Sequence, residues 1–211
     1  MLSLRFAAVK PRPLRSLQKP FSYAILKNMK SVNLYTDGAC SGNQNETNIG
    51  GWGCVLEYGP HIKELHGGQP DTTNNRMELT ALIEALSALK EKGLRLRIFS
   101  DSSYLINCFK NRWYVKWKAN GWKTSGRAPV ENRDLWEQLL GLLDGNDAEF
   151  YLIKGHLDPV GDSPKMKKAY EKFCSHNGNG FSYEEFIRIS EFNCRCDELA
   201  NVFIGEYREQ Q

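Results

Sequence analysis

The sequence predicts a single domain of the α/β class, with helices packed on a β-sheet. Residues 32–36 (VNLYT) and 94–100 (LRLRIFS) alternate apolar and polar side chains, as half-buried strands do. Between them lies an apolar stripe at helical spacing, formed by Leu79, Leu82, Ile83, Leu86 and Leu89. About 175 of the 211 residues follow the basic N-terminal segment, and a chain of that length can bury one core.

Four acidic residues stand beside these elements. Asp37 follows the first strand, at the turn-like string DGACSGN, and Asp101 follows the second strand. Glu78 lies early in the helical stretch, and Asp197 opens a last one, DELANVFIGEY, where a helix N-terminus favours negative charge. Two strand ends and two helix starts can share one edge of a sheet, and four convergent carboxylates suit two Mg²⁺ ions. Taken singly, each acid has another interpretation, because such residues often serve only in turns or as helix caps.

Positive charge is concentrated in two segments, although the net charge is only +3. Residues 1–36 hold seven Lys or Arg and no acid, and residues 102–130 hold six more with none. The second segment interleaves its cations with Trp113, Trp117 and Trp122. Cations that hold phosphates and indoles that pack on sugars or bases are typical of nucleic-acid binding. The alternatives are a solvated helix face for the cations and core packing for the tryptophans.

The order of the motifs TDGxxxxN, NNRxE, SDSxY, KGH and CDELA resembles the type 1 ribonuclease H family over about residues 32–207. The resemblance implies a five-stranded mixed sheet flanked by helices, in an enzyme that cleaves the RNA strand of RNA/DNA hybrids. It makes Asp37, Glu78, Asp101 and Asp197 the ligands of two Mg²⁺ ions, for which Mn²⁺ can substitute. One ion would activate the attacking water and the other would stabilise the leaving 3′ oxygen, which gives 5′-phosphate and 3′-hydroxyl ends.

The same resemblance implies a set of substrate contacts. Amide side chains both donate to and accept from a ribose 2′-hydroxyl, the group that distinguishes RNA from DNA. The residues expected at the RNA strand are Cys40, Asn43, Asn74 and Asn75. Those expected at the DNA strand are Trp113, Trp117 and Ser125 in a channel, with Thr73 and Asn132 at a phosphate. Without the resemblance, strings such as SGNQNETN and TTNN would be interpreted as loops and caps.

His156, in the string KGH, resembles the family's loop histidine that assists proton transfer or product release, whereas a lone His is more often a surface residue. The chain departs from the family pattern here, because 40 residues separate His156 from Asp197 and imply an insertion at about 158–192. Two helical patterns around the turn NGNG, with Ser182 and Glu185 as a capping box, predict a helical hairpin. Four lysines on its first helix either extend the nucleic-acid surface or simply face solvent: Lys165, Lys167, Lys168 and Lys172.

Residues 1–30 form a basic leader that resembles a mitochondrial presequence, with a disordered basic arm as the alternative. The ribonuclease H domain is then expected at 31–211. Initiation at Met29 would give a second, cytoplasmic or nuclear form, so an intracellular protein is expected in either case. No run of about 20 apolar residues predicts a membrane span, and the six cysteines show no zinc-site spacing.

Three functions fit these patterns. The first is an active endonuclease on RNA/DNA hybrids, expected to be a monomer with no obligatory protein partner. The second is a catalytically weak or inactive protein that binds hybrids, with the insertion blocking or displacing the site. The third is a domain derived from a retroelement polymerase, which is disfavoured because these 211 residues contain no polymerase segment. A replication primer, an R-loop and a mitochondrial transcript all remain open as the natural hybrid.

Overall fold

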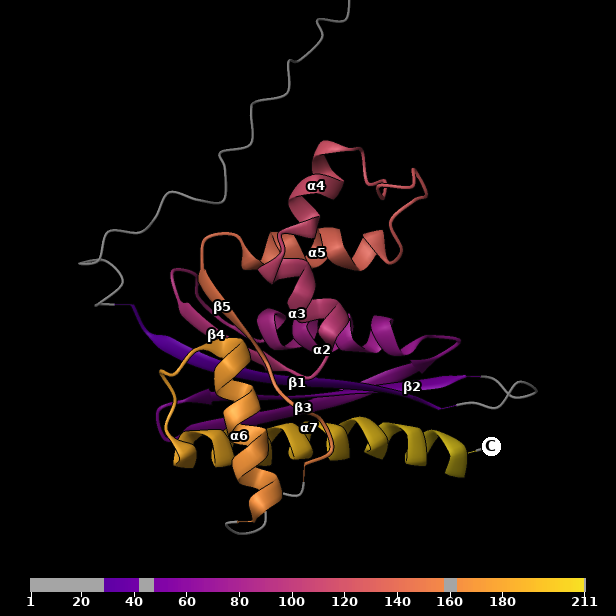
Figure 1. Ribbon diagram of the computed structural model, residues 1–211. Coiled ribbons are helices and arrows are strands. Elements are labelled where there is room, and N and C mark those ends of the chain that lie inside the picture. Colours follow the sequence, from indigo (N-terminus) through magenta and orange to yellow (C-terminus); the bar gives the residue numbers. More distant parts are fainter. Residues whose placement is uncertain (1–28, 42–47, 158–162, 211) are drawn as a thin grey trace, which may run out of the picture.

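A five-stranded sheet crosses the middle of the molecule, in the strand order β3-β2-β1-β4-β5 (Figure 1). The computed structural model describes residues 29–41, 48–157 and 163–210, so most of the leader and Asn43 lie outside the described residues. The strands are β1 (Ser31–Ser41), β2 (Ile49–Tyr58), β3 (His61–Pro70), β4 (Arg95–Ser100) and β5 (Asp147–Leu152). Strands β1, β2 and β3 pair antiparallel, whereas β1, β4 and β5 pair parallel. The predicted mixed sheet is therefore confirmed.

Helices cover both faces of the sheet (Figure 1). One face carries α2 (Asn74–Ser87), α3 (Ser103–Lys110), α4 (Trp113–Ala119) and α5 (Arg133–Leu143). The other face carries α6 (Pro164–Asn177) and α7 (Tyr183–Glu209). Each layer has its own buried apolar cluster, and the alternation along β1 supplies both, because Leu34 belongs to the first cluster and Tyr35 to the second.

Strand β1 continues past the point at which the sequence predicted a turn. Asp37 was expected at the strand's end, but β1 runs on to Ser41 because this segment pairs with β2, from Asp37 opposite Gly53 to Ser41 opposite Ile49. Only the parallel pairing with β4 stops at this level, at Thr36 opposite Ser100. The prediction of a turn that begins at Asp37 was wrong because Gly38 serves close packing instead, whereas Gly42 lies outside the described residues. A Cβ on Gly38 would clash with the backbone of α2 at Glu78.

Helix α7 is also longer than the sequence predicted. Asp197 was expected to open the last helix, but it lies in the middle of one continuous helix of 27 residues. No Pro or Gly interrupts the chain between Ser182 and Asp197, so nothing local ends the helix there. Two glycines of β2 let α7 approach the sheet closely, because a Cβ on Gly51 or Gly53 would clash with backbone carbonyl oxygens of α7. Asp197 is thus placed by a helix interior that is pressed against β2.

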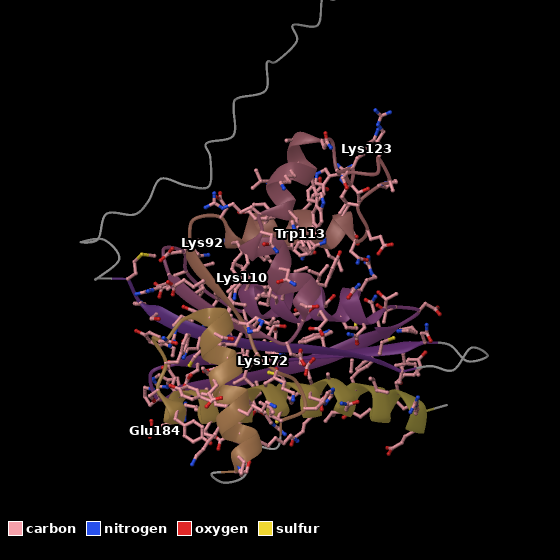
Figure 2. The ribbon with its side chains drawn as sticks, in the orientation of Figure 1. Lys92, Lys110, Trp113, Lys123, Lys172 and Glu184 are labelled. Carbon is pink, nitrogen blue, oxygen red and sulfur yellow. The ribbon has the colours of Figure 1, made fainter. Side chains whose placement is uncertain are left out.

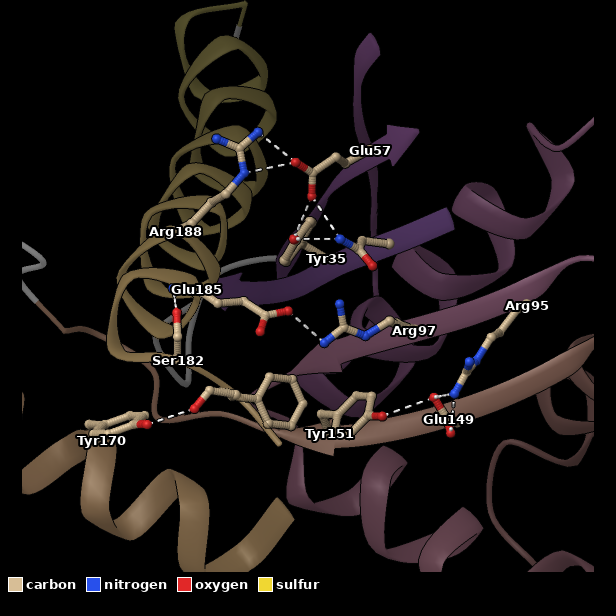
Figure 3. Close-up of polar contacts among 12 residues, drawn as sticks. Tyr35, Glu57, Arg95, Arg97, Glu149, Tyr151, Tyr170, Ser182, Glu185 and Arg188 are labelled. Carbon is tan, nitrogen blue, oxygen red and sulfur yellow. Dashed lines mark hydrogen bonds and ion pairs between the residues drawn. The ribbon is translucent and has the colours of Figure 1, made fainter. Parts of the chain in front are cut away.

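The segment interpreted as an insertion forms α6, the NGNG turn and the first half of α7. Ser163 and Ser182 cap the two helices, each accepting a hydrogen bond from the backbone N–H three residues on. Ion pairs join this segment to the sheet (Figure 3): Arg188 Nε donates to Glu57 Oε1 over 2.8 Å, and Arg97 pairs with Glu185 over 2.7 Å. The second helix does not end near residue 192 but continues through the site, so the insertion is built into the second layer.

The carboxylate of Glu57 gathers the polar groups of this layer. Its Oε2 atom accepts from Tyr35 OH and from Asn33 Nδ2, each over 2.8 Å, while Arg188 holds Oε1. Burial alone would raise the pKa of Glu57, but these hydrogen bonds outweigh it and hold that pKa below its usual value.

Within the described residues, none of the helices is both long and apolar enough to cross a membrane.

Candidate active site

Three carboxylates from three different elements meet at the centre of the sheet. Ligand oxygens of Asp37, Glu78 and Asp101 all lie within 4.8 Å of one another. Asp37 comes from β1 where its pairing with β4 stops, and Asp101 is the first residue after β4. Glu78 comes from the second turn of α2, which the absence of a side chain at Gly38 allows to lie directly on β1. Parallel pairing and one close contact thus bring together residues that are up to 64 positions apart.

This cluster holds more negative charge than its surroundings can neutralise. Burial raises the pKa of Asp37 to about 8, and the nearby charges of Asp101 and Asp197 act in the same direction. Burial raises the pKa of Glu78 well above its usual value, again with help from Asp37 and Asp101. The Oε2 atom of Glu78 is buried and has no hydrogen-bond partner among the described residues. Carboxylates at this separation, one of them with a buried and unpartnered oxygen, fit a hard divalent cation such as Mg²⁺ or Mn²⁺.

Asp197 lies beside this group rather than inside it. The burial of its side chain is incomplete, with 35% exposed, and its negative charge raises the pKa of both Asp37 and Asp101. Asn201, one turn further along α7, donates from Nδ2 to Asp197 Oδ1 over 3.1 Å. The other oxygen, Oδ2, lies 3.9 Å from Nδ1 of His156. The structure therefore brings the fourth acid and the histidine to the same place, next to the three carboxylates.

His156 occupies a loop position that its neighbours determine. Its side chain is 82% exposed, and its backbone has φ +52°, in the left-handed region that residues other than glycine rarely adopt. The preceding residue, Gly155, packs so tightly that a Cβ there would clash with the carboxylate of Asp101. His156 also lowers the pKa of Asp101, against the larger effect of burial. The histidine thus stands at the open side of the acidic cluster.

The residues predicted to contact RNA lie around the start of α2. Asn74 is exposed and Asn75 is half-buried, both in the first turn of α2 and within four residues of Glu78. Cys40, on β1, donates from its thiol to the carbonyl oxygen of Thr72 over 3.6 Å. Together these residues border the acidic cluster on its β1 and α2 side. Their roles in substrate binding stay predictions.

A residue that sequence reasoning did not single out joins the two predicted phosphate ligands. Thr73 caps α2 by accepting from the backbone N–H of Arg76 over 3.4 Å, and Asn132 accepts from the Arg76 guanidinium over 3.3 Å. Arg76 also forms an ion pair with Asp134 at 2.7 Å. Thr73 and Asn132 therefore do lie near each other, although they come from different helices. The signal was present in the motif NNRxE, which was interpreted only for its asparagines and its glutamate.

The basic, tryptophan-rich segment stands away from the sheet, as the labels of Trp113 and Lys123 show in Figure 2. Trp113 and Trp117 are half-buried on α4, with ring centroids 6.3 Å apart, so each keeps an accessible part. Trp122 is buried, as the core interpretation of these tryptophans expected. Lys110 donates to the backbone and side chain of α6 at His176 and Asn177. The remaining five basic side chains are exposed, and so is Ser125.

Comparison with known proteins gives one consistent result. The family model described as RNase H matches residues 29–164. A protein named ribonuclease H from Chlorobium phaeovibrioides is 52% identical over 175 residues, covering 83% of this chain and 96% of that protein. Another protein of that name, from Moorella thermoacetica, is 43% identical over 183 residues, covering 87% of this chain and 97% of that protein.

Solved structures share the fold. LC9-RNase H1, described as a type 1 RNase H with the type 2 active-site motif, is 28% identical with a TM-score of 0.54. The match covers 75% of this chain and 81% of that one. LC11-RNase H1, solved in complex with an RNA/DNA hybrid, is 18% identical with a TM-score of 0.51, which shows likeness of fold alone. That match covers 83% of this chain and 98% of the other.

Proposed function

This chain belongs to the ribonuclease H family, and from that premise we propose that it is an endoribonuclease that hydrolyses the RNA strand of RNA/DNA hybrids. The products have 5′-phosphate and 3′-hydroxyl ends. One observation carries the proposal: the buried carboxylates of Asp37, Glu78 and Asp101 converge within 4.8 Å, at the place where the family's motifs fall in this sequence.

The reaction uses two divalent cations, with Mg²⁺ as the expected ion. Asp37, Glu78 and Asp101 would hold them, with Asp197 beside them, and the unpartnered Oε2 of Glu78 supports a cation at this position. When bound, such ions activate the attacking water and stabilise the leaving 3′ oxygen. His156, 3.9 Å from Asp197 on the open side of the cluster, is placed to move a proton or to assist release of the product.

Recognition of the hybrid comes from two sides of the cluster. Asn74 and Asn75, at the start of α2, present amides that can read the 2′-hydroxyls of the RNA strand. Trp113, Trp117 and the exposed cations around them bind the DNA strand, chiefly through its phosphates and sugars. Thr73 and Asn132, both bonded to Arg76, hold one DNA phosphate between these two regions. The substrate is then a hybrid rather than either uniform duplex.

Cleavage of a hybrid labelled on its RNA strand tests this proposal, beside RNA/RNA and DNA/DNA duplexes of the same sequence. We expect the full chain with Mg²⁺ to cut only the hybrid, and Asp101→Asn to abolish cutting while hybrid affinity stays within about tenfold. Binding without cutting in both Mg²⁺ and Mn²⁺ would instead support a hybrid-binding protein. Cutting of DNA/DNA duplexes at a similar rate would contradict the assignment of a 2′-hydroxyl reader, and cutting of RNA/RNA duplexes would contradict the assigned contacts to the DNA strand.

A further inference from the structure

The loop between β5 and α6 carries two neighbouring residues with opposite exposure. The side chain of His156 is 82% exposed, whereas Leu157 is only 3% exposed. Leu157 belongs to the buried apolar cluster of the second layer, which also contains residues of α6, the following turn and α7: Met166, Ala169, Phe173, Phe181, Phe186 and Ile189. The segment interpreted as an insertion therefore supplies half of the other buried residues in the cluster that holds Leu157, directly beside the histidine.

A hydrogen bond holds the same residue from a second direction. The thiol of Cys194 donates to the carbonyl oxygen of Leu157 over 2.8 Å. Cys194 lies on α7 three residues before Asp197, which is nearly one helical turn. The backbone beside His156 is thus bonded to the helical turn that carries Asp197.

The other side of His156 is equally constrained. Gly155 packs against the carboxylate of Asp101, so closely that any side chain at that position would clash. Between these two contacts the backbone of His156 adopts φ +52°, which a residue with a Cβ holds only where its surroundings enforce it. A side chain whose backbone is held on both sides loses little conformational entropy when it takes up the reactive geometry, which favours the reaction.

We propose that Leu157 is a positioning residue, through which α6 and the first half of α7 hold His156 beside Asp197. The inference rests on the proposed function, because it gives His156 a part in hydrolysis of the hybrid. It assigns a task to the 40-residue spacing between His156 and Asp197: the added helices build the apolar cluster that anchors the loop.

A double-mutant cycle tests whether Leu157 acts through His156. We expect Leu157→Ala to lower kcat about tenfold with KM within twofold, and Leu157→Met, which nearly keeps the volume, to restore most of it. In a His156→Ala background, Leu157→Ala should have no further effect on kcat. The matched control is Leu86→Ala, which removes an equally buried leucine (4% exposed) from the C-terminal end of α2 and should leave kcat unchanged. An equal loss of kcat in both backgrounds, or the same loss in the control, would overturn the proposal.

Two further measurements keep the test independent of folding and of the proposed function. Should Leu157→Ala fail to fold, Cys194→Ala removes the hydrogen bond to the Leu157 carbonyl and should lower kcat about threefold, while Cys174→Ala, also a half-buried thiol, should not. Hydrogen exchange of the 154–157 segment should rise at least tenfold in Leu157→Ala but not in Leu86→Ala. If the unmodified chain does not cut hybrids, the proposed function fails. Unchanged exchange in Leu157→Ala would separately refute the anchoring.

Discussion

Replacing Asp37 by asparagine should make the metal-free protein more stable while abolishing its activity. The pKa of Asp37 is raised from 3.8 to about 8 by burial and by the neighbouring acids, so the folded state binds its proton more tightly than the unfolded state. The stability that Asp37 contributes through its proton is therefore fully present below about pH 4 and is lost as the pH rises toward 8. An asparagine carries no charge and escapes this loss.

The size of the effect follows from the pKa and one hydrogen bond. Each pH unit between 3.8 and an assay at pH 7 is equivalent to ~1.4 kcal/mol, which gives an upper limit of ~4 kcal/mol. The amide still accepts from the backbone N–H of Gly38, now 2.7 Å from Asp37 Oδ1, but burying its NH2 group costs ~1–2 kcal/mol. We expect a net gain of ~2–3 kcal/mol at pH 7, or ~4–12 °C in melting temperature.

Thermal and urea unfolding in EDTA at pH 4 and pH 7 measure this difference. The free energy of unfolding of Asp37→Asn should exceed that of the unmodified protein at pH 7 and equal it at pH 4. Asp144→Asn, which changes an exposed acid at the end of α5, should alter the free energy of unfolding at neither pH. Adding Mg²⁺ should stabilise the unmodified protein more than Asp37→Asn, because a cation that binds only the folded state adds to its stability. A variant that is less stable than the unmodified protein at pH 7, or more stable by the same amount at both pH values, would refute the account from burial and charge repulsion.

Three other outcomes are expected. Gly53→Ala should destabilise the fold by ~1–3 kcal/mol and slow cleavage, because its Cβ would push α7 away from β2. The control Gly141→Ala, on α5 with open space around it, should stabilise the fold by up to ~1 kcal/mol, and urea unfolding and cleavage rates of both variants measure these effects. Glu57→Gln should lower the free energy of unfolding by ~1–3 kcal/mol at pH 7. Since the pKa of Glu57 is lowered in the folded state, this difference from the unmodified protein should shrink as the pH falls below about 4, and an equal difference at pH 7 and pH 3 would contradict the ion pair with Arg188. Replacing Lys116 and Lys118 by Gln should reduce by up to ~1.8 the slope of the logarithm of the association constant for the hybrid against the logarithm of salt concentration. An unchanged slope in filter-binding titrations would show that these lysines do not contact phosphates.

Local patterns predicted the parts of the fold that local forces decide. The alternation at 32–36 and 94–100 predicted the first half of β1 and all of β4, and the apolar stripe predicted α2. The meeting of Asp37, Glu78 and Asp101 followed from placing each acid beside one of these elements. These elements were accessible because side-chain periodicity reports which face of a strand or helix is buried.

Errors arose where contacts between distant segments overrode local signals. Glycines such as Gly38, Gly51 and Gly53 are typical of turns, but in the folded chain these three are sites where a helix backbone lies on the sheet. The sequence at Asp197 is typical of a helix start, yet α7 already includes the residues before it because they pack in the second layer. The burial of Leu157 next to an exposed histidine depends on residues up to 32 positions further along the chain, and no window of sequence displays it.

The packing of α7 on the sheet bears on how the protein is made. Its ion pairs to β2 and β3, from Arg188 to Glu57 and from Arg195 to Glu64, each join residues 131 positions apart. During synthesis, the face of the sheet that carries Tyr35 and Val55 stays uncovered until α7 has left the ribosome, because these contacts form only then. Asp197 arrives on the same helix, so a nascent chain completes this layer of its core and gains its fourth acid together.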